Sequence, residues 1–250
     1  MSQLKRLMPL IFTGMFLSTV NAEPQRTNFT VENKFPLWEQ FEMGAGYTGI
    51  GMDDDSFIAQ DRGRAYGYVR YGILDNLAVQ LDIPYENVDL PAGGSESGLG
   101  DLDVEFQLRT YEDIFGYPYF IPHVSFTIPT GDEDKGLGVD GVAVKFGLSY
   151  GSTINDWIDW VLDASYVVIP DQNDQIELAN SYVWNISDVF GLVTEVFYSD
   201  SIEDSDDSEV IITGGITYEW TESIQMDLSV GGGLTGPVDV YGQGSVSYTF

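Results

Sequence analysis

The feature that most constrains the fold of this chain is an alternation of apolar and polar side chains that recurs from Trp38 onward. The final stretch, Val238 to Phe250, shows the pattern clearly and ends on an aromatic side chain. Successive side chains of a β-strand point to opposite faces of the sheet. The stretch therefore predicts a strand with one apolar face and one polar face.

The same alternation predicts about twelve strands of about ten residues each, which is the length of a tilted strand that crosses a membrane. Alternation alone would also fit a soluble β-sandwich. The connections favour a barrel, because long joints (49–61, 86–100) alternate with short ones (74–76). We predict an all-β fold: a transmembrane, antiparallel, up-and-down β-barrel with short periplasmic turns and longer outer loops.

The placement of charge supports this interpretation. A basic side chain that faced lipid at the bilayer midplane would cost about 2–4 kcal/mol. Every basic residue in the predicted strands falls on a polar face, and aromatic residues end the apolar faces as they do at membrane interfaces. These basic residues are Arg64, Arg70, Arg109 and Lys145. We expect the apolar faces to contact the lipid and lipopolysaccharide of a bacterial outer membrane.

The first 22 residues have the order of a secretory signal peptide. Lys5 and Arg6 precede an apolar run, and Ala22 supplies a small residue at the predicted cleavage site. A membrane-spanning anchor is the weaker alternative, because the run is short and contains polar residues. Residues 23–37 show no period and predict a periplasmic lead-in or a plug, followed by the barrel at 38–250.

The last strand also resembles the closing strand of bacterial outer-membrane β-barrels, in which the final residue is commonly Phe. We therefore expect Phe250 and its strand to contact the barrel-assembly machinery.

Two short motifs suggest a family. They are Gly98-Leu99-Gly100-Asp101-Leu102, which leads into a strand, and Ile128-Pro129-Thr130-Gly131-Asp132, which closes the next one. Together they resemble the family of outer-membrane porins assigned to the meta-pathway of phenol degradation. The resemblance implies a barrel for the uptake of aromatic or other small organic compounds, and it carries no catalytic residues. Loop chemistry alone is the alternative, since Gly and Asp shape turns and Pro ends strands.

Composition excludes some partners. The formal net charge is −30, so nucleic acid is not expected to bind. The chain has no cysteine and therefore no disulfide or thiolate ligand. Two acidic runs, Asp53–Asp55 and Ser201–Glu209, lack the spacing of a calcium loop and predict solvated outer loops. We predict neither a cofactor nor a metal site.

His123 is the only histidine and shares a face with Ser125. Residues two apart on a strand lie about 7 Å apart, which is too far for direct proton transfer. A serine from another strand could still approach, so an enzyme that uses His123 remains an alternative. Carboxylate pairs such as Asp159 and Asp163 could also do acid–base chemistry, but ion pairs with basic residues across the lumen are favoured. We predict no catalytic residue.

The polar faces should line a lumen. Barrels of about eight strands are filled by side chains and those of about sixteen leave a channel, so about twelve is intermediate. Small polar-face residues predict free space along the wall, and acidic residues outnumber basic ones there. The pore-lining candidates are Arg64, Arg70, Asp82, Asp103, Glu105, Arg109, His123, Lys145, Asp159, Asp163, Glu195 and Asp227.

These candidates predict a narrow, net acidic pore that prefers cations or neutral solutes. We expect an outer-membrane channel for passive uptake of small molecules. A sealed structural or adhesion barrel is the alternative if residues 23–37 plug the opening.

Overall fold

A computed structural model describes residues 25–250 except 33, 35, 37, 53–60, 91–92, 111–118, 171 and 203–207. The predicted signal peptide at 1–22 lies outside the described residues. In the described part of the chain, no helix is long and apolar enough to cross a membrane.

The described residues form thirteen strands and one short 3-10 helix, η1 (Glu133–Lys135). In chain order the strands are β1 (Phe41–Met52), β2 (Arg62–Leu74), β3 (Leu77–Asp89), β4 (Ser95–Leu99), β5 (Leu102–Leu108), β6 (Tyr119–Ile128), β7 (Ala143–Asn155), β8 (Ile158–Val168), β9 (Gln175–Ser187), β10 (Phe190–Ser201), β11 (Glu209–Thr221), β12 (Ile224–Thr235) and β13 (Val238–Thr249).

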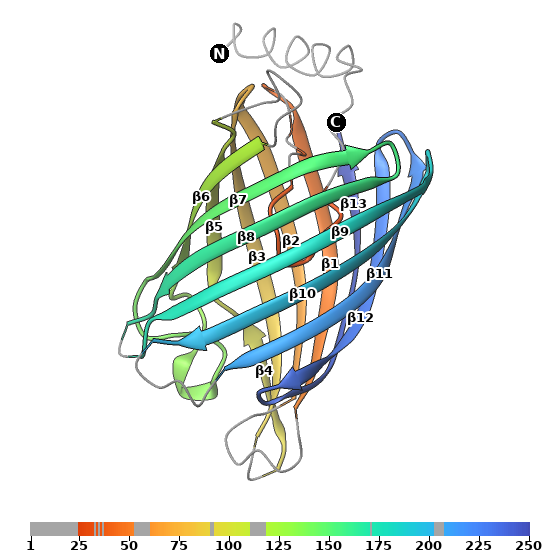
Figure 1. Cartoon of the computed structure of the whole chain (residues 1–250). Coiled ribbons are helices and arrows are strands. Elements are labelled where there is room, and N and C mark those ends of the chain that lie inside the picture. Colours follow the sequence, from red (N-terminus) through yellow and green to blue (C-terminus); the bar gives the residue numbers. More distant parts are fainter. Residues whose placement is uncertain are drawn as a thin grey trace, which may run out of the picture.

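The strands close into a barrel (Figure 1). Neighbours are antiparallel, and β13 pairs with β1 from Glu42↔Thr249 onward, which removes both edges of the sheet. β4 and β5 pair with successive parts of β3, so they form one barrel strand that is interrupted at 100–101. The predicted fold is confirmed: the barrel is closed, antiparallel and twelve-stranded.

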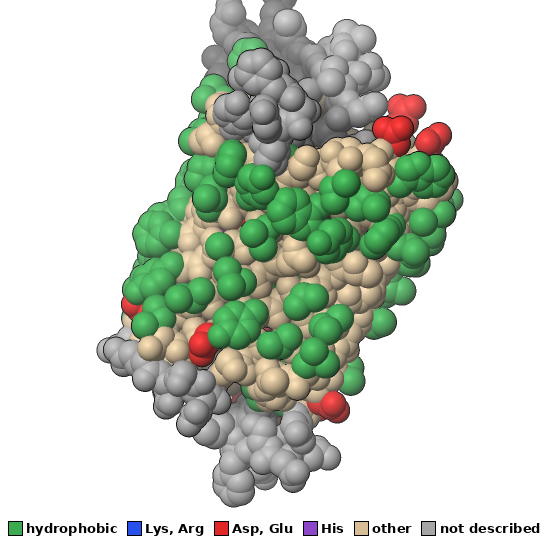
Figure 2. Space-filling model, viewed as in Figure 1, with side chains coloured by type: hydrophobic (Ala, Val, Ile, Leu, Met, Phe, Trp, Pro, Cys, Tyr) green, Lys and Arg blue, Asp and Glu red, His purple; other side chains and the backbone are tan. Residues whose placement is uncertain are grey.

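Alternation along each strand separates the outer face from the lumen. The predicted apolar positions are exposed, among them Met43, Leu81 and Val246, whereas many polar side chains are buried inside. Figure 2 shows hydrophobic side chains spread over the outside of the barrel and acidic ones toward its ends. Asn180 faces outward within β9, where its Oδ1 accepts a hydrogen bond from Trp160 Nε1 at 2.6 Å. This bond satisfies a polar group in an otherwise apolar surface.

The two ends of the barrel differ. Short turns at 75–76, 156–157, 188–189 and 222–223 lie at the end that also carries Phe250, which we call the turn end (Figure 1). Longer connections, including residues 129–142 between β6 and β7, lie at the opposite, loop end.

The N-terminal segment, defined here by the described residues 25–32, lies inside the barrel (Figure 1). Thr30 and Glu32 are buried, and Val31 packs against Ala78 of β3 and Ile121 of β6. The segment therefore occupies lumen space that would otherwise hold water.

Candidate functional site: the lumen of the barrel

Three cavities lie along the lumen. The loop-end cavity has a volume of about 690 Å³ and is lined from β2, β3, β5 to β9 and residues 137–139. The central cavity, about 240 Å³, lies between the N-terminal segment and β1, β2, β3, β12 and β13. The turn-end cavity, about 510 Å³, is lined by the short turns together with Arg26 and Lys34. Arg64 and Asp82 line both the first and the second cavity, and Arg26 lines both the second and the third.

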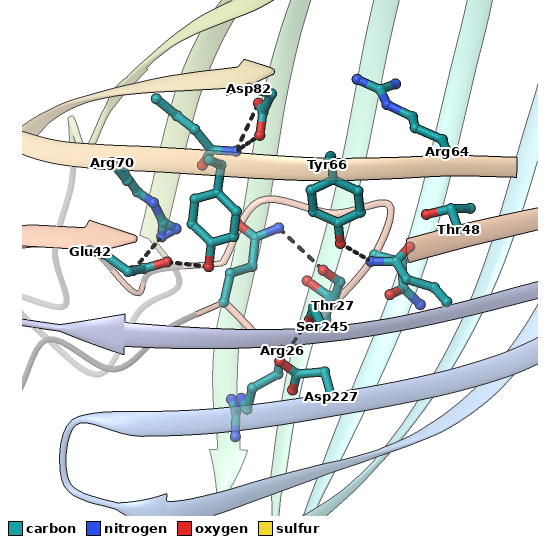
Figure 3. A pocket seen from close by; sticks show the side chains of 15 residues that line it. Arg26, Thr27, Glu42, Thr48, Arg64, Tyr66, Arg70, Asp82, Asp227 and Ser245 are labelled. Atoms are coloured by element: carbon teal, nitrogen blue, oxygen red, sulfur yellow. Dashed lines mark hydrogen bonds and ion pairs between the residues drawn. The ribbon is translucent and has the colours of Figure 1, made fainter. Parts of the chain in front are cut away.

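Two tyrosines of β2 form part of the wall of the central cavity (Figure 3). Tyr68 lies against Gly44 and Tyr66 against Gly46 on the neighbouring β1, so closely that neither glycine could carry a Cβ without a shift of the ring. His123 covers Gly147 of β7 in the same way. The expectation that these small residues leave open space was therefore wrong at these positions, because the ring of a neighbouring strand fills it.

The basic residues of the wall pair with carboxylates. Arg64 lies 2.8 Å from Asp103 and 3.5 Å from Glu86. Lys145 lies 2.6 Å from Glu177.

At the turn end of β2, Arg70 lies 3.6 Å from Glu42, and both are 1% exposed. Its Nη1 also donates to the backbone carbonyl of Lys34 at 2.9 Å. All of these pairs join adjacent or next-but-one strands, so the expectation of ion pairs across the lumen is corrected to ion pairs along its wall.

Two carboxylates face the central cavity and are held by neutral donors. Asp82 accepts hydrogen bonds from Gln80 Nε2 at 3.0 and 3.1 Å. Asp227 accepts from Gln225 Nε2 at 2.9 and 3.0 Å and from Ser245 at 3.3 Å. Arg26, Arg64 and Arg70 line the same cavity, but they pair with other carboxylates, whereas the hydrogen bonds given above to Asp82 and Asp227 come from uncharged donors.

His123 lies in a buried cluster. Its Nε2 is 2.9 Å from Asp163 Oδ2, and its Nδ1 is 3.7 Å from Glu105. Ser149 also donates to Asp163, and Ser165 donates to Asp163 at 2.8 Å. Both serines thus donate to the Asp163 carboxylate rather than to the imidazole of His123. His123, Ser149 and Asp163 are all buried and line none of the three cavities, so the cluster lacks the geometry of a nucleophile–base pair with room for a substrate.

Glu195 of β10 and Asp159 of β8 hold the N-terminal segment. Glu195 accepts the backbone N–H groups of Asn28 at 3.0 Å and of Phe29 at 3.2 Å. Asp159 lies 2.8 Å from Arg26, a residue that the sequence reasoning missed because its segment shows no periodicity. The only sequence signal for Arg26 was its charge, because the predicted polar faces carry more acidic than basic residues and could pair with a basic residue from outside the strands.

Arg109 does not join the other candidates along the wall. β5 ends at Leu108, and the Arg109 guanidinium donates to the carbonyl oxygen of Asp75 at 2.7 Å in the turn between β2 and β3. Its placement is therefore corrected to the turn end, because the strand is shorter than the alternation suggested.

Residues 28–249 match the model of the Phenol_MetA_deg family, described as "Putative MetA-pathway of phenol degradation". The chain belongs to this family. The match spans the barrel and most of the N-terminal segment, and it confirms the family that the two loop motifs indicated. No curated protein sequence matches.

Solved structures of similar fold are outer-membrane barrels. The COG4313 outer membrane channel from Pseudomonas putida F1 aligns with a TM-score of 0.69 at 14% identity, over 91% of this chain and 100% of that one. The KdgM porin aligns at 0.59 and 10% identity, over 83% and 99%. The CymD monoaromatic hydrocarbon channel aligns at 0.50 and 10% identity, over 85% and 88%. At these identities the likeness concerns the fold.

Proposed function

We propose that the protein is a passive outer-membrane channel for small organic solutes, aromatic ones among them. The observation that carries the proposal is the series of three cavities, in which each shares lining residues with the next. A solute that entered the loop-end cavity would pass Arg64 and Asp82, then Arg26, to reach the turn end. The apolar outer face suits the lipid and lipopolysaccharide of a bacterial outer membrane.

The central cavity offers a reason for preferring aromatic solutes. Tyr66 and Tyr68 lie with their rings against the glycines of β1, which leaves the other face of each ring toward the lumen. Aromatic rings attract other rings at centroid distances of about 4.5–7 Å. Asp82 and Asp227, nearby, would repel anions. The preferred solutes are therefore neutral or cationic compounds that include an aromatic ring.

A sealed structural barrel is the second candidate, and the N-terminal segment favours it. The side chains of Thr30 and Glu32 are buried, and the segment bonds to β8, β9 and β10. In the channel hypothesis the same segment narrows the lumen without closing it.

An enzyme that uses His123 has less support, because the imidazole lies outside the three cavities and its Nε2 is hydrogen-bonded to the buried Asp163.

The deciding experiment is single-channel recording of the refolded protein in a planar bilayer, with asymmetric KCl to measure selectivity. The matched variant lacks residues 23–32, and heat-modifiable migration in gels verifies that both proteins fold. Under the channel hypothesis the intact protein conducts steadily with a cation preference, and the truncated one conducts more. Conduction by the truncated protein alone would identify a sealed barrel. Absence of current from both folded proteins would exclude the channel function.

Solute preference needs a second measurement. Liposomes that contain the protein should swell faster in benzyl alcohol or a benzylammonium salt than in benzoate of similar size. Equal rates for the cation and the anion would contradict the role assigned to Asp82 and Asp227.

A further inference from the structure

The two motifs that indicated the family meet at one residue, Asp101. It lies in the break between β4 and β5, and its side chain is buried. Its Oδ1 accepts the backbone N–H groups of Thr130 at 3.0 Å and Gly131 at 2.8 Å, and its Oδ2 accepts that of Val139 at 2.7 Å. One carboxylate thus holds both ends of the loop 129–142.

A second pair of hydrogen bonds, made by Thr130, supports those of Asp101. Thr130 Oγ1 donates to the carbonyl of Gly100 at 3.0 Å and accepts the N–H of Leu102 at 3.1 Å. Gly138 passes so close to Asp101 that a Cβ there would collide with the carboxylate. These contacts give a physical reason for Asp101 in the first motif and Thr130 in the second, which loop composition alone had left open.

The loop 129–142, which these hydrogen bonds hold at its base, is compact. η1 begins after Asp132, whose carbonyl accepts the N–H groups of Lys135 at 3.1 Å and Leu137 at 3.0 Å. Gly136 follows with a φ of 71°, a left-handed conformation that glycine adopts without strain. Asp132 also pairs with Lys135 at 2.9 Å. The loop therefore behaves as one unit held at its base.

This unit extends inward over the lumen. The loop leaves the barrel between β6 and β7, yet Arg62 of β2 donates to the Gly136 carbonyl at 2.9 Å. β5 and β3 lie between β6 and β2 in the sheet, so the loop spans the width of these strands. Leu137 is 4% exposed and lines the loop-end cavity together with Gly138 and Val139. Part of the mouth of the lumen is thus covered by the loop.

We propose that Asp101 latches the loop 129–142 over the loop end of the lumen as a fixed constriction, which limits the size of the solutes that enter. The inference rests on the proposed channel function. Asp101 is a positioning residue: it acts through the loop, and the apolar residues 137 and 139 form the edge that a solute passes.

Limited trypsin digestion tests the latch without any need for conduction. Lys135 is half-exposed at the tip of the loop and offers a cleavage site. Cleavage after Lys135 should become at least about tenfold faster in Asp101→Ala, because loss of one hydrogen bond to a charged group shifts the opening equilibrium by that much. Asp132→Ala removes a carboxylate from the same loop but leaves the Asp101 bonds, so it should change the rate less. Equal rates in Asp101→Ala and wild type would overturn the latch.

Liposome swelling with neutral sugars of increasing size tests the constriction. We expect Asp101→Ala to admit larger sugars than wild type and Asp132→Ala to keep the wild-type limit. A variant in which residues 133–138 are replaced by two glycines serves if Asp101→Ala fails to fold, and it should also admit larger sugars. A conducting wild type whose size limit is unchanged by opening or shortening the loop would overturn the constriction alone. Silence from both the wild type and the loop-shortened protein would overturn the channel function, and the size limit with it.

Discussion

Both carboxylate oxygens of Glu195 lie 3.0 Å from the backbone nitrogen of Asn28, which ties the N-terminal segment to the wall of the barrel. Glu195 is 1% exposed and also accepts a hydrogen bond from Ser181 at 2.8 Å. A buried carboxylate that is fully hydrogen-bonded is a strong anchor, because removal of its partners leaves a desolvated charge.

We predict that Glu195→Ala releases the segment. Loss of one hydrogen bond to a charged group costs about 1.5–3 kcal/mol, and this substitution removes several. Arg26, now buried, should become accessible to trypsin, and the conductance should rise. Glu222→Gln, in an exposed turn, is the control and should keep Arg26 protected. Continued protection of Arg26 in Glu195→Ala would show that the other contacts of the segment, Asp159 with Arg26 and Ser181 with Thr30 among them, hold it without Glu195.

Neutralisation of Asp227 and Asp163 should have different effects. Asp227 faces the central cavity, so Asp227→Asn should lower the cation preference, as the shift of the reversal potential in a KCl gradient reports. Asp163 accepts hydrogen bonds in a buried cluster, so Asp163→Asn should lower the free energy of unfolding by about 1–3 kcal/mol and leave selectivity unchanged. The opposite pattern would refute the assignment of Asp227 to the permeation route.

Selectivity should depend on pH through Lys34. Burial lowers the pKa of Lys34 from 10.5 to about 8, although the charges of Glu219, Asp159 and Asp227 act in the opposite direction. The lysine is therefore mainly charged at pH 7 and mainly neutral at pH 9. Docking of the N-terminal segment carries the full penalty of the buried charge below about pH 8, and this penalty shrinks as the pH rises from about 8 and is gone above 10.5.

Loss of this positive charge from the turn-end cavity should increase cation preference between pH 7 and pH 9. The other charged residues that line this cavity are Arg26, Asp156, Asp159, Asp188 and Glu219. Recordings at both pH values should show the change in wild type and in Lys135→Gln, whose lysine is exposed in the outer loop. Lys34→Gln should remove it, and a persistent pH effect in that variant would assign the titration to another group.

Gly44 should be sensitive to a single added methyl group. Gly44→Ala forces the ring of Tyr68 off the wall and strains its 2.8 Å hydrogen bond to Glu42, with an expected cost of about 1–3 kcal/mol. Gly242→Ala is the matched control, because a Cβ there meets no atom within 4 Å. Urea unfolding in lipid vesicles should separate the two variants. Equal stabilities would show that the ring moves without cost.

Deletion of Phe250 tests the proposed contact with the barrel-assembly machinery. Its backbone N–H donates to the carbonyl of Phe41 at 2.8 Å across the closing seam, and its ring packs edge-on against Tyr248 with centroids 4.5 Å apart. We expect the deletion to reduce assembled protein in cells more than refolding yield in detergent. An equal reduction in both would assign Phe250 to seam packing alone.

Local residue order was enough to determine the barrel. The period of two separated lipid-facing from lumen-facing positions, since a pleated strand sends successive side chains to opposite sides whatever its neighbours are. Asn180 broke the pattern and still faces outward, because strand geometry outranks the polarity of one residue. Its partner, Trp160, is on the adjacent strand and could not be identified from order alone.

Tertiary structure decided the contents of the lumen. Arg26 and Asp159 are 133 positions apart in the chain and meet only because the N-terminal segment enters the closed barrel. Tyr68 covers Gly44 because the register of β1 with β2 sets them opposite each other. Asp101 reaches Val139 because two loops converge at one end of the barrel. Alternation specifies the face on which a side chain lies, whereas register, closure and the path of a non-periodic segment specify what it touches.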